Sequence, residues 1–300
     1  MSKYNKYINN FANDAEYEAY INGSIAEVPN TALIDDTGEI KMTKYLPNNY
    51  VMFGTTTGTQ DFMIGQSQEQ YPSADCIQIH VVVEDESGIN KMYVAQEDVL
   101  KIPKYFFSSY NGFNNSEGNK IVSIKKWKID TSNVDGIDGM FRNCKSLASI
   151  DLSNFVTINV TSMGNMFYDC SSLTSLDLSN FSTSKVTSIS GMFMYCDSLK
   201  SLNLSSFDTI NATSMETMFY SCSNINKLYL SSSFFNSTSL TKYEFNSLSG
   251  WKDTESLAMF VEAITAHNGG GKTVKLTNGA KNELTTEQKN SITDAGWTIA

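Results

Sequence analysis

Four of the five cysteines recur at a constant interval, and cysteine is the residue type in this chain best suited to metal binding or redox chemistry. Cys144, Cys170, Cys196 and Cys222 follow one another at a constant 26-residue step. If each step is one turn of a repeating coil, the outer two thiols lie roughly 14 Å apart, three steps of about 4.8 Å. One tetrahedral zinc ion cannot span that distance. The spacing favours buried free thiols that pack as small apolar residues. A disulfide between neighbouring thiols stays open as an alternative, since it depends on the Cβ directions.

The other reactive residue types form no catalytic pattern. The only histidines, His80 and His267, have no cysteine or serine motif beside them, so we expect no histidine-based active site. Residues 269–273 read Gly-Gly-Gly-Lys-Thr and superficially resemble a phosphate-binding loop. They lack the Walker spacing and follow a predicted helix instead of a strand, which indicates a linker. We therefore predict a protein that is not an enzyme, with no catalytic residue, no cofactor and no metal site.

The interval of the cysteines is shared by the apolar positions around them. Met-Phe pairs precede each cysteine, and a Leu-x-x-Leu-x-Leu pattern follows it. Such a pattern inside a fixed period of 20–30 residues is typical of leucine-rich repeats. The predicted fold class is thus an α/β repeat, a leucine-rich-repeat solenoid over residues 121–250, preceded by a small β-rich domain. Besides the cysteines, the predicted repeat core comprises Phe141, Phe167, Phe193, Phe219, Leu152, Leu178, Leu204 and Leu230.

Two columns of polar or amphipathic residues accompany this core. In Leu176-Asp177-Leu178, alternation directs the leucines inward and Asp177 outward, so Asp151, Asp177 and Asn203 form an outward column. They could bind a cation or a partner, or simply be a solvated strand face. Tyr168, Tyr195 and Tyr220 recur at nearly the same interval as the cysteines. They could stack on sugars, or be partly buried supports of the Met-Phe stretch, which we expect to form a short helical or 3₁₀ turn.

Flanking segments complete four predicted regions: 1–48, 49–120, 121–250 and 251–300. The first would carry a short helix from Asn13 or Asp14 to Ile21 and a hairpin over 29–42, as an attachment module. The second would be β-rich, with strands over 76–83 and 91–95 and a join to the repeats near 109–119. The last would be an α/β cap. Its predicted elements are a helix over 253–266, a strand over 273–276, a helix over 285–295 with Thr286 as a possible N-cap, and a strand over 296–299.

Charge and hydropathy exclude some classes of partner. The net charge is −10 and the pI about 4.7, which argues against nucleic acid, because phosphate binding needs a clustered basic face. No apolar run approaches the ~20 residues of a membrane span, so membrane insertion is not expected. The opening segment, Met1 to Ser24, lacks the apolar core of a signal peptide. The chain is therefore expected to stay in the cell that makes it, or to leave by a route other than general secretion.

The repeat motif carries a family resemblance. Residues 167–181 read Phe-x-x-Cys-x-Ser-Leu-x-Ser-Leu-Asp-Leu-Ser-Asn-Phe, followed by a Val-Thr-Ser stretch and the next Met-Phe pair. This resembles the BspA-type leucine-rich repeat of bacterial surface proteins, over about residues 121–300. The resemblance implies a recognition scaffold for surface display and adhesion. Residues 140–230 hold five basic and six acidic residues, and a nearly neutral polar face suits a glycan or a protein partner.

A second resemblance concerns the opening segment. Residues 11–21, Phe-Ala-Asn-Asp-Ala-Glu-Tyr-Glu-Ala-Tyr-Ile, and residues 28–36 are similar to the start of virion proteins from crAss-like phages of gut Bacteroidales. This implies a phage virion protein, a head fibre, capsid decoration or tail-associated part, located in the virion. Its N-terminal region would bind other virion proteins, its solenoid would meet a host-surface protein or glycan, and the default assembly is a homo-oligomer. The alternatives are a BspA-type adhesin of the bacterial cell surface and an intracellular scaffold.

Overall fold

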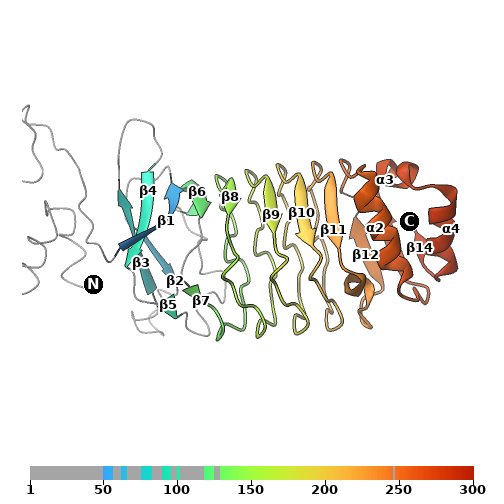
Figure 1. The fold of residues 1–300 in the computed structure, drawn as a ribbon, viewed down its shortest axis with the longest axis horizontal. Coiled ribbons are helices and arrows are strands. Elements are labelled where there is room, and N and C mark those ends of the chain that lie inside the picture. The colour runs from blue at the N-terminus through green and yellow to red at the C-terminus, as the bar shows by residue number, and fades with distance from the viewer. Residues whose placement is uncertain are drawn as a thin grey trace, which may run out of the picture.

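The structure is a computed structural model that describes residues 50–56, 62–65, 76–82, 90–95, 100–101, 118–124, 129–245 and 247–300. The predicted helix near residues 13–21, the hairpin over 29–42 and the whole attachment module over 1–48 lie outside the described residues. Figure 1 shows a sheet at one end, a row of coils along the long axis, and helices at the other end.

The first sheet contains the two strands expected between residues 76 and 95. They are β3 (Cys76–Val82) and β4 (Asn90–Ala95), which pair antiparallel. Three further strands were not predicted: β1 (Tyr50–Thr56), β2 (Phe62–Gly65) and β5 (Leu100–Lys101). β1 and β2 pair antiparallel with β4 and β3, whereas β5 pairs with β7 (Ile129–Asp130).

This sheet continues directly into the coils. After η5 (Gly118–Lys120), β6 (Ile121–Ile124) pairs antiparallel with β1 on one side and parallel with β8 (Ser149–Ile150) on the other. Ile124 faces Ile150 in that register, one repeat period away. The strand order β2-β3-β4-β1-β6-β8 thus crosses the domain boundary predicted at residue 120, and a single hydrogen-bonded sheet joins the N-terminal strands to the first coil.

One face of the coil array is a parallel sheet with a register of one period. β9 (Ser175–Asp177), β10 (Ser201–Leu204) and β11 (Lys227–Leu230) lie side by side, with Leu176, Leu202 and Leu228 in register. The alternation Leu-x-Leu turns one face of each strand inward, and these leucines are buried. Each coil therefore covers the apolar side chains of its neighbour.

The opposite face is a second ladder, built from turns. Gly136, Ser162, Ser188 and Ser214 form successive parallel bridges. In the next residues of each coil except the last, every second backbone N–H donates to a carbonyl of the following coil, as from Phe167 to Met192 (2.9 Å). The Met-Phe segment is a run of turns that includes the predicted 3₁₀ type, since its remaining N–H groups donate three residues back, as from Cys170 to Phe167 (3.1 Å). It does not continue into a regular helix. The cause is that alternate N–H groups bond to the next coil and are not all available for bonds within a helix.

Between the two faces runs a continuous apolar core that includes stacked phenylalanine rings. Phe141, Phe167, Phe193 and Phe219 are all buried, and consecutive rings are 5.5, 5.9 and 6.0 Å apart between centroids. Phe245 extends the stack at 5.4 Å from Phe219. Every predicted core residue, including Leu152, Leu178, Leu204 and Leu230, is buried.

A column of buried threonines ties the corner of each coil to the next. Thr131, Thr157 and Thr183 each donate through Oγ1 to a backbone carbonyl of the following coil and accept the backbone N–H of that same residue. For Thr183 the two distances to Asp208 are 2.9 Å (O) and 2.7 Å (N). Thr209 donates in the same way to Phe234. One hydroxyl thus satisfies both backbone groups of a partly buried residue.

The C-terminal end is closed by helices over a small sheet. α2 (Thr254–Thr265) is capped by Asp253, and β13 (Thr273–Leu276) occupies the predicted strand. The last helix, α4 (Thr286–Asp294), is capped by Thr285 in a capping box with Gln288, so the predicted N-cap Thr286 is wrong by one position. The remaining elements are η6 (Ser232–Phe235), β12 (Lys242–Phe245), α3 (Asn278–Glu283) and β14 (Thr298–Ile299). The sheet order is β12-β13-β14, all parallel.

We predict that Thr183→Val lowers the free energy of unfolding by about 2 kcal/mol, because it leaves the Asp208 N–H and C=O without their partner at nearly constant volume. Thr187→Val is the matched control in the same coil, since Thr187 is exposed and its hydroxyl donates to the Thr161 carbonyl at 3.1 Å. We expect the control to change the free energy by less than about 0.5 kcal/mol. Urea denaturation of both variants measures this, and equal losses would refute the role of the threonine column.

Candidate functional site

The cysteine column is buried and hydrogen-bonded to the coil before it. Cys170, Cys196 and Cys222 donate through Sγ to the carbonyls of Phe141, Phe167 and Phe193, at 3.1, 3.1 and 2.9 Å. None of these four thiols, Cys144 included, forms a disulfide in the part of the chain that the structure describes. Burial raises the pKa of each thiol, in Cys222 to about 12. The thiols are therefore neutral at physiological pH, and those of Cys170, Cys196 and Cys222 donate hydrogen bonds that join neighbouring coils.

The outward column of Asp151, Asp177 and Asn203 closes the strand ends. One side-chain oxygen of each residue accepts the backbone N–H two positions later, at 2.9, 2.9 and 3.0 Å. These are Asx-type turns, which favour Asp and Asn for this local bond. The three residues lie on one face of the coil array, and the side chain of each stabilises the turn that follows it.

The tyrosine column forms an edge-to-face ladder. Tyr168 and Tyr195 are 5.4 Å apart between ring centroids and Tyr195 and Tyr220 are 5.6 Å apart, with near-perpendicular planes. The guanidinium of Arg142 covers Tyr168 at 4.7 Å. Tyr220, with 49% of its surface exposed, is the most accessible of the three. The three rings thus pack against one another, and Arg142 covers the first of them.

The histidine and glycine motifs have structural surroundings in the cap. The His267 Nε2 atom is 2.6 Å from the Ser232 carbonyl, whereas the side chain of His80 lies outside the described residues. Gly269 and Gly271 donate their backbone N–H groups to Ala295 and Gly296. A Cβ at Gly269 would lie 2.5 Å from the Gly296 carbonyl oxygen. The glycine-rich segment is thus a tight linker between α2 and β13.

A groove opens where the turn ladder of the coils meets the C-terminal sheet. It has a volume of about 400 Å³ and lies between residues 213–217 of the last coil and residues 239–242 with Glu244. In each earlier coil the N–H groups at the positions of Met215, Thr217 and Phe219 donate to the following turn. In the part of the chain that the structure describes, these three N–H groups have no backbone acceptor. The turn ladder is therefore interrupted at the groove.

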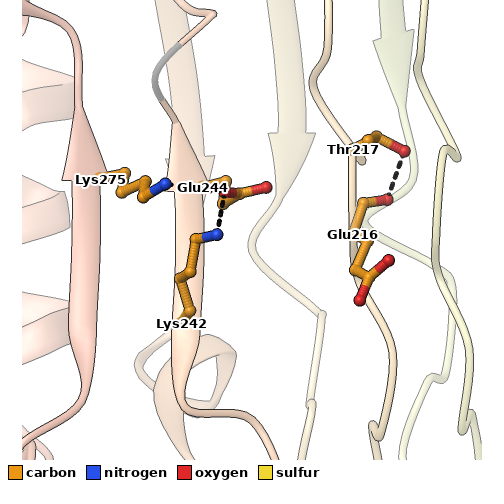
Figure 2. Close-up of polar contacts among 5 residues, drawn as sticks. All are labelled: Glu216, Thr217, Lys242, Glu244 and Lys275. Carbon is orange, nitrogen blue, oxygen red and sulfur yellow. Dashed lines mark hydrogen bonds and ion pairs between the residues drawn. The ribbon is translucent and has the colours of Figure 1, made fainter.

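Charged side chains stand on both walls of the groove (Figure 2). The Lys242 Nζ is 2.5 Å and the Lys275 Nζ 3.4 Å from the Glu244 Oε1. The hydrogen bond from Lys242 is the main reason that the pKa of Glu244 lies below its ordinary value. Glu216 lies on the facing coil and forms no salt bridge with a cation among the described residues. The groove thus contains one carboxylate in direct ion pairs, Glu244, and one that interacts with Lys242 only at longer range, Glu216.

The coil wall of the groove contains a residue in an unfavourable backbone conformation. Thr217 has φ 56°, and its counterparts one, two and three coils earlier are Gly191, Asn165 and Gly139, with φ 62°, 54° and 61°. Glycine and asparagine tolerate this left-handed region, whereas a β-branched residue there is an outlier. Since the local conformation is the same in all four coils, the Thr217 N–H has the same direction as those that donate to a following turn.

Sequence reasoning did not predict this site. The five residues drawn in Figure 2 belong to the last coil, β12 and β13, and no motif joins them. One signal was present: threonine stands at residue 217 in a column that otherwise holds Gly and Asn. The residues proposed from sequence as partner-binding, Asp151, Asp177, Asn203, Tyr168, Tyr195 and Tyr220, do not line the groove.

No cluster of three or more His, Cys, Asp or Glu side chains among the described residues could hold a metal ion. None of the helices described is both long enough and apolar enough to cross a membrane.

The stacked coils define the class of this molecule as a repeat protein with a 26-residue unit. Residues 106–233 match a family model described as "Mycoplasma protein of unknown function, DUF285". That match is consistent with a BspA-type repeat protein. Neither the curated proteins nor the solved structures contain a match to this chain.

We predict that the buried thiols are unreactive in the folded protein. In a Cys76→Ser variant, a thiol reagent at pH 8 should modify Cys144, Cys170, Cys196 and Cys222 at least about a hundredfold more slowly than in urea, because the thiolate is the nucleophile. Since folding raises the pKa of Cys222 from 9.0 to about 12, its contribution to stability is complete below pH 9 and is lost as the pH approaches 12. Mass spectrometry of labelled peptides measures the modification rate of each thiol. Labelling of the folded protein at the rate of the unfolded protein would contradict the prediction.

Thr217→Asn should stabilise the protein by about 1 kcal/mol, since asparagine tolerates positive φ better than a β-branched residue and already stands at Asn165. Gly191→Ala should destabilise it, because the added Cβ would lie 2.5 Å from the Asn165 Oδ1 at φ 62°. Thr213→Asn, at an exposed position of the same coil, serves as the control for the exchange of side chains. Thermal unfolding reports all three, and a lower Tm for Thr217→Asn than for the control would disprove the strain.

Proposed function

We propose that this protein is a non-enzymatic recognition protein displayed on a biological surface, and that its coil array is a leucine-rich-repeat solenoid of BspA type. The observation that carries the proposal is the coil array itself. Similar coils stack through two backbone ladders around one core, which makes a rigid, extended platform. The match over residues 106–233 supports the BspA-like assignment.

The surface chemistry supports binding more than catalysis. The thiols donate to backbone carbonyls, and the Asp and Asn column accepts backbone N–H groups. The residue types that could do chemistry therefore have structural partners. What the array offers to a partner is an outer surface of Ser, Thr, Asn and a few compensated charges, such as Lys145 with Asp169 at 2.9 Å. Such a surface suits hydrogen bonding to a glycan or a protein.

Two surfaces are candidates for the display. The resemblance of residues 11–36 to virion proteins of crAss-like phages supports a virion location, in which the N-terminal region binds other virion proteins as a head fibre, capsid decoration or tail-associated part. The family match supports the alternative, a BspA-like protein of the bacterial cell surface. A homo-oligomer fits either location, since rigid extended modules commonly assemble symmetrically.

Quantitative mass spectrometry of purified virions and of bacterial envelope and cytosolic fractions tests the proposal. We expect the protein to be enriched in virions or in the envelope, on the outer side. Enrichment in virions selects the phage protein, and protease-accessible enrichment in the envelope selects the BspA-like adhesin. A chain found only in the cytosol would show that the protein is not displayed and would overturn the proposal.

A further inference from the structure

The two walls of the groove, the last coil and β12, each present a row of backbone polar groups to the other wall. On the coil wall these are the N–H groups of Met215 and Thr217, directed toward β12 as in the preceding coils. On the other wall, Thr241 accepts a hydrogen bond from Thr273 of the neighbouring strand. Because successive residues of a strand direct their backbone groups to opposite edges, the N–H and C=O groups of Lys242 and Glu244 face the groove.

The hydrogen bonds that do not form between the two walls indicate which ligand groups could bind there. The register of the earlier coils, in which Gly191 donates to Glu216 and Phe193 to Met218, continues to Lys242 and Glu244. It would make the Lys242 carbonyl the acceptor for Thr217 and the Glu244 carbonyl the acceptor for Phe219, but neither bond forms. A group that bridges such a donor and acceptor must accept on one side and donate on the other. A hydroxyl group does both, and a ligand with several adjacent hydroxyls could bridge more than one such pair.

The side chains around the groove favour the same chemistry. Thr213, Ser239 and Thr241 line it with hydroxyls, and the Glu216 carboxylate forms no salt bridge in the described part of the chain. A carboxylate is a strong acceptor for ligand O–H groups, since charged acceptors form the stronger hydrogen bonds. A volume of about 400 Å³ accommodates a small ligand, within the ordinary range for binding pockets.

Two other ligand classes fit less well. An anion would meet the carboxylates of Glu216 and Glu244, and Lys242 already contacts Glu244. An extended peptide has N–H and C=O groups that alternate along its edge, whereas the coil wall presents a row of N–H groups. A peptide edge would therefore direct some of its own N–H groups at the N–H row of the coil.

We infer that the groove formed by residues 213–217, 239–242 and Glu244 is a saccharide-binding site, in which sugar hydroxyls bridge the coil N–H groups and the β12 carbonyls and donate to Glu216. The inference rests on the proposed recognition function, since it names the ligand class of that function. Surface display can still be correct if the groove binds no sugar. The two ideas therefore fail in different experiments.

Saturation-transfer NMR on the full chain tests the site. The probes are the methyl glycosides of glucose, galactose, mannose, fucose, N-acetylglucosamine and N-acetylgalactosamine, each at about 10 mM, a concentration suited to millimolar Kd values. We expect at least one of them to bind. Thr213→Trp, which fills the groove, should weaken that binding at least about tenfold. Thr161→Trp is the matched control, because Thr161 occupies the same coil position two coils earlier and makes the same contact to a preceding carbonyl.

A second pair of variants keeps the test decisive if the tryptophan variants do not fold. Glu216→Gln should weaken binding about three- to tenfold by removing a charged acceptor, whereas Glu262→Gln, at an exposed position of α2, should leave it unchanged. Absence of binding by all six glycosides would overturn the inference, as would equal binding by the variants of each pair. Binding of a basic octapeptide that Thr213→Trp abolishes, with no binding of glycosides, would replace the saccharide by a peptide and overturn it as well.

Discussion

The structure depends on one interaction, the backbone hydrogen bonds that join each coil to the next. On the turn face the N–H groups of alternate residues all point toward the C-terminal side, and carbonyls of the following coil receive them. The threonine column and the cysteine thiols add side-chain bonds between neighbouring coils. No coil can satisfy these groups alone, and an unpaired buried backbone group costs about 1–3 kcal/mol. Strict repetition of the sequence follows, because donors and acceptors meet only if every coil has the same length.

Because all the hydrogen bonds of the turn ladder run in one direction, the two ends of the coil array differ. The molecule covers each end with a different structure. At the N-terminal end β6 carries the hydrogen bonding into the sheet of β1 to β4. At the C-terminal end the phenylalanine stack continues from Phe219 to Phe245, and α2 packs over β11 and η6. The core is thus continuous across this junction although the turn ladder is not. The groove results from that difference: apolar packing needs only contact, whereas a hydrogen bond needs a distance below about 3.2 Å and a good angle.

Much of the repeat region could be predicted because its signals are local and periodic. The columns of Cys, Phe and Leu are buried as predicted, and the helix at Thr254–Thr265 and the strand at Thr273–Leu276 occur where alternation and helical spacing placed them. The errors have physical reasons. The Met-Phe segment forms the predicted short turns but no regular helix, because alternate N–H groups bond to the next coil. Thr285, not Thr286, caps α4 because Gln288 completes its capping box. The strands β1, β2 and β5 went unpredicted, and they pair with β4, β3 and β7, which are separate segments of the chain.

The sequence by itself determined the period, the buried columns and the neutral, polar character of the outer face, since each follows from residue type and spacing alone. Only the tertiary structure decided that the first sheet joins the coils through β6, that the threonines bond to a neighbouring coil, and that Glu216, Thr217, Lys242 and Glu244 line one groove. The physical reason is that these features depend on how closely segments separated by a full coil or more approach one another. A small change in that spacing makes or breaks a hydrogen bond and leaves the pattern of residues unchanged.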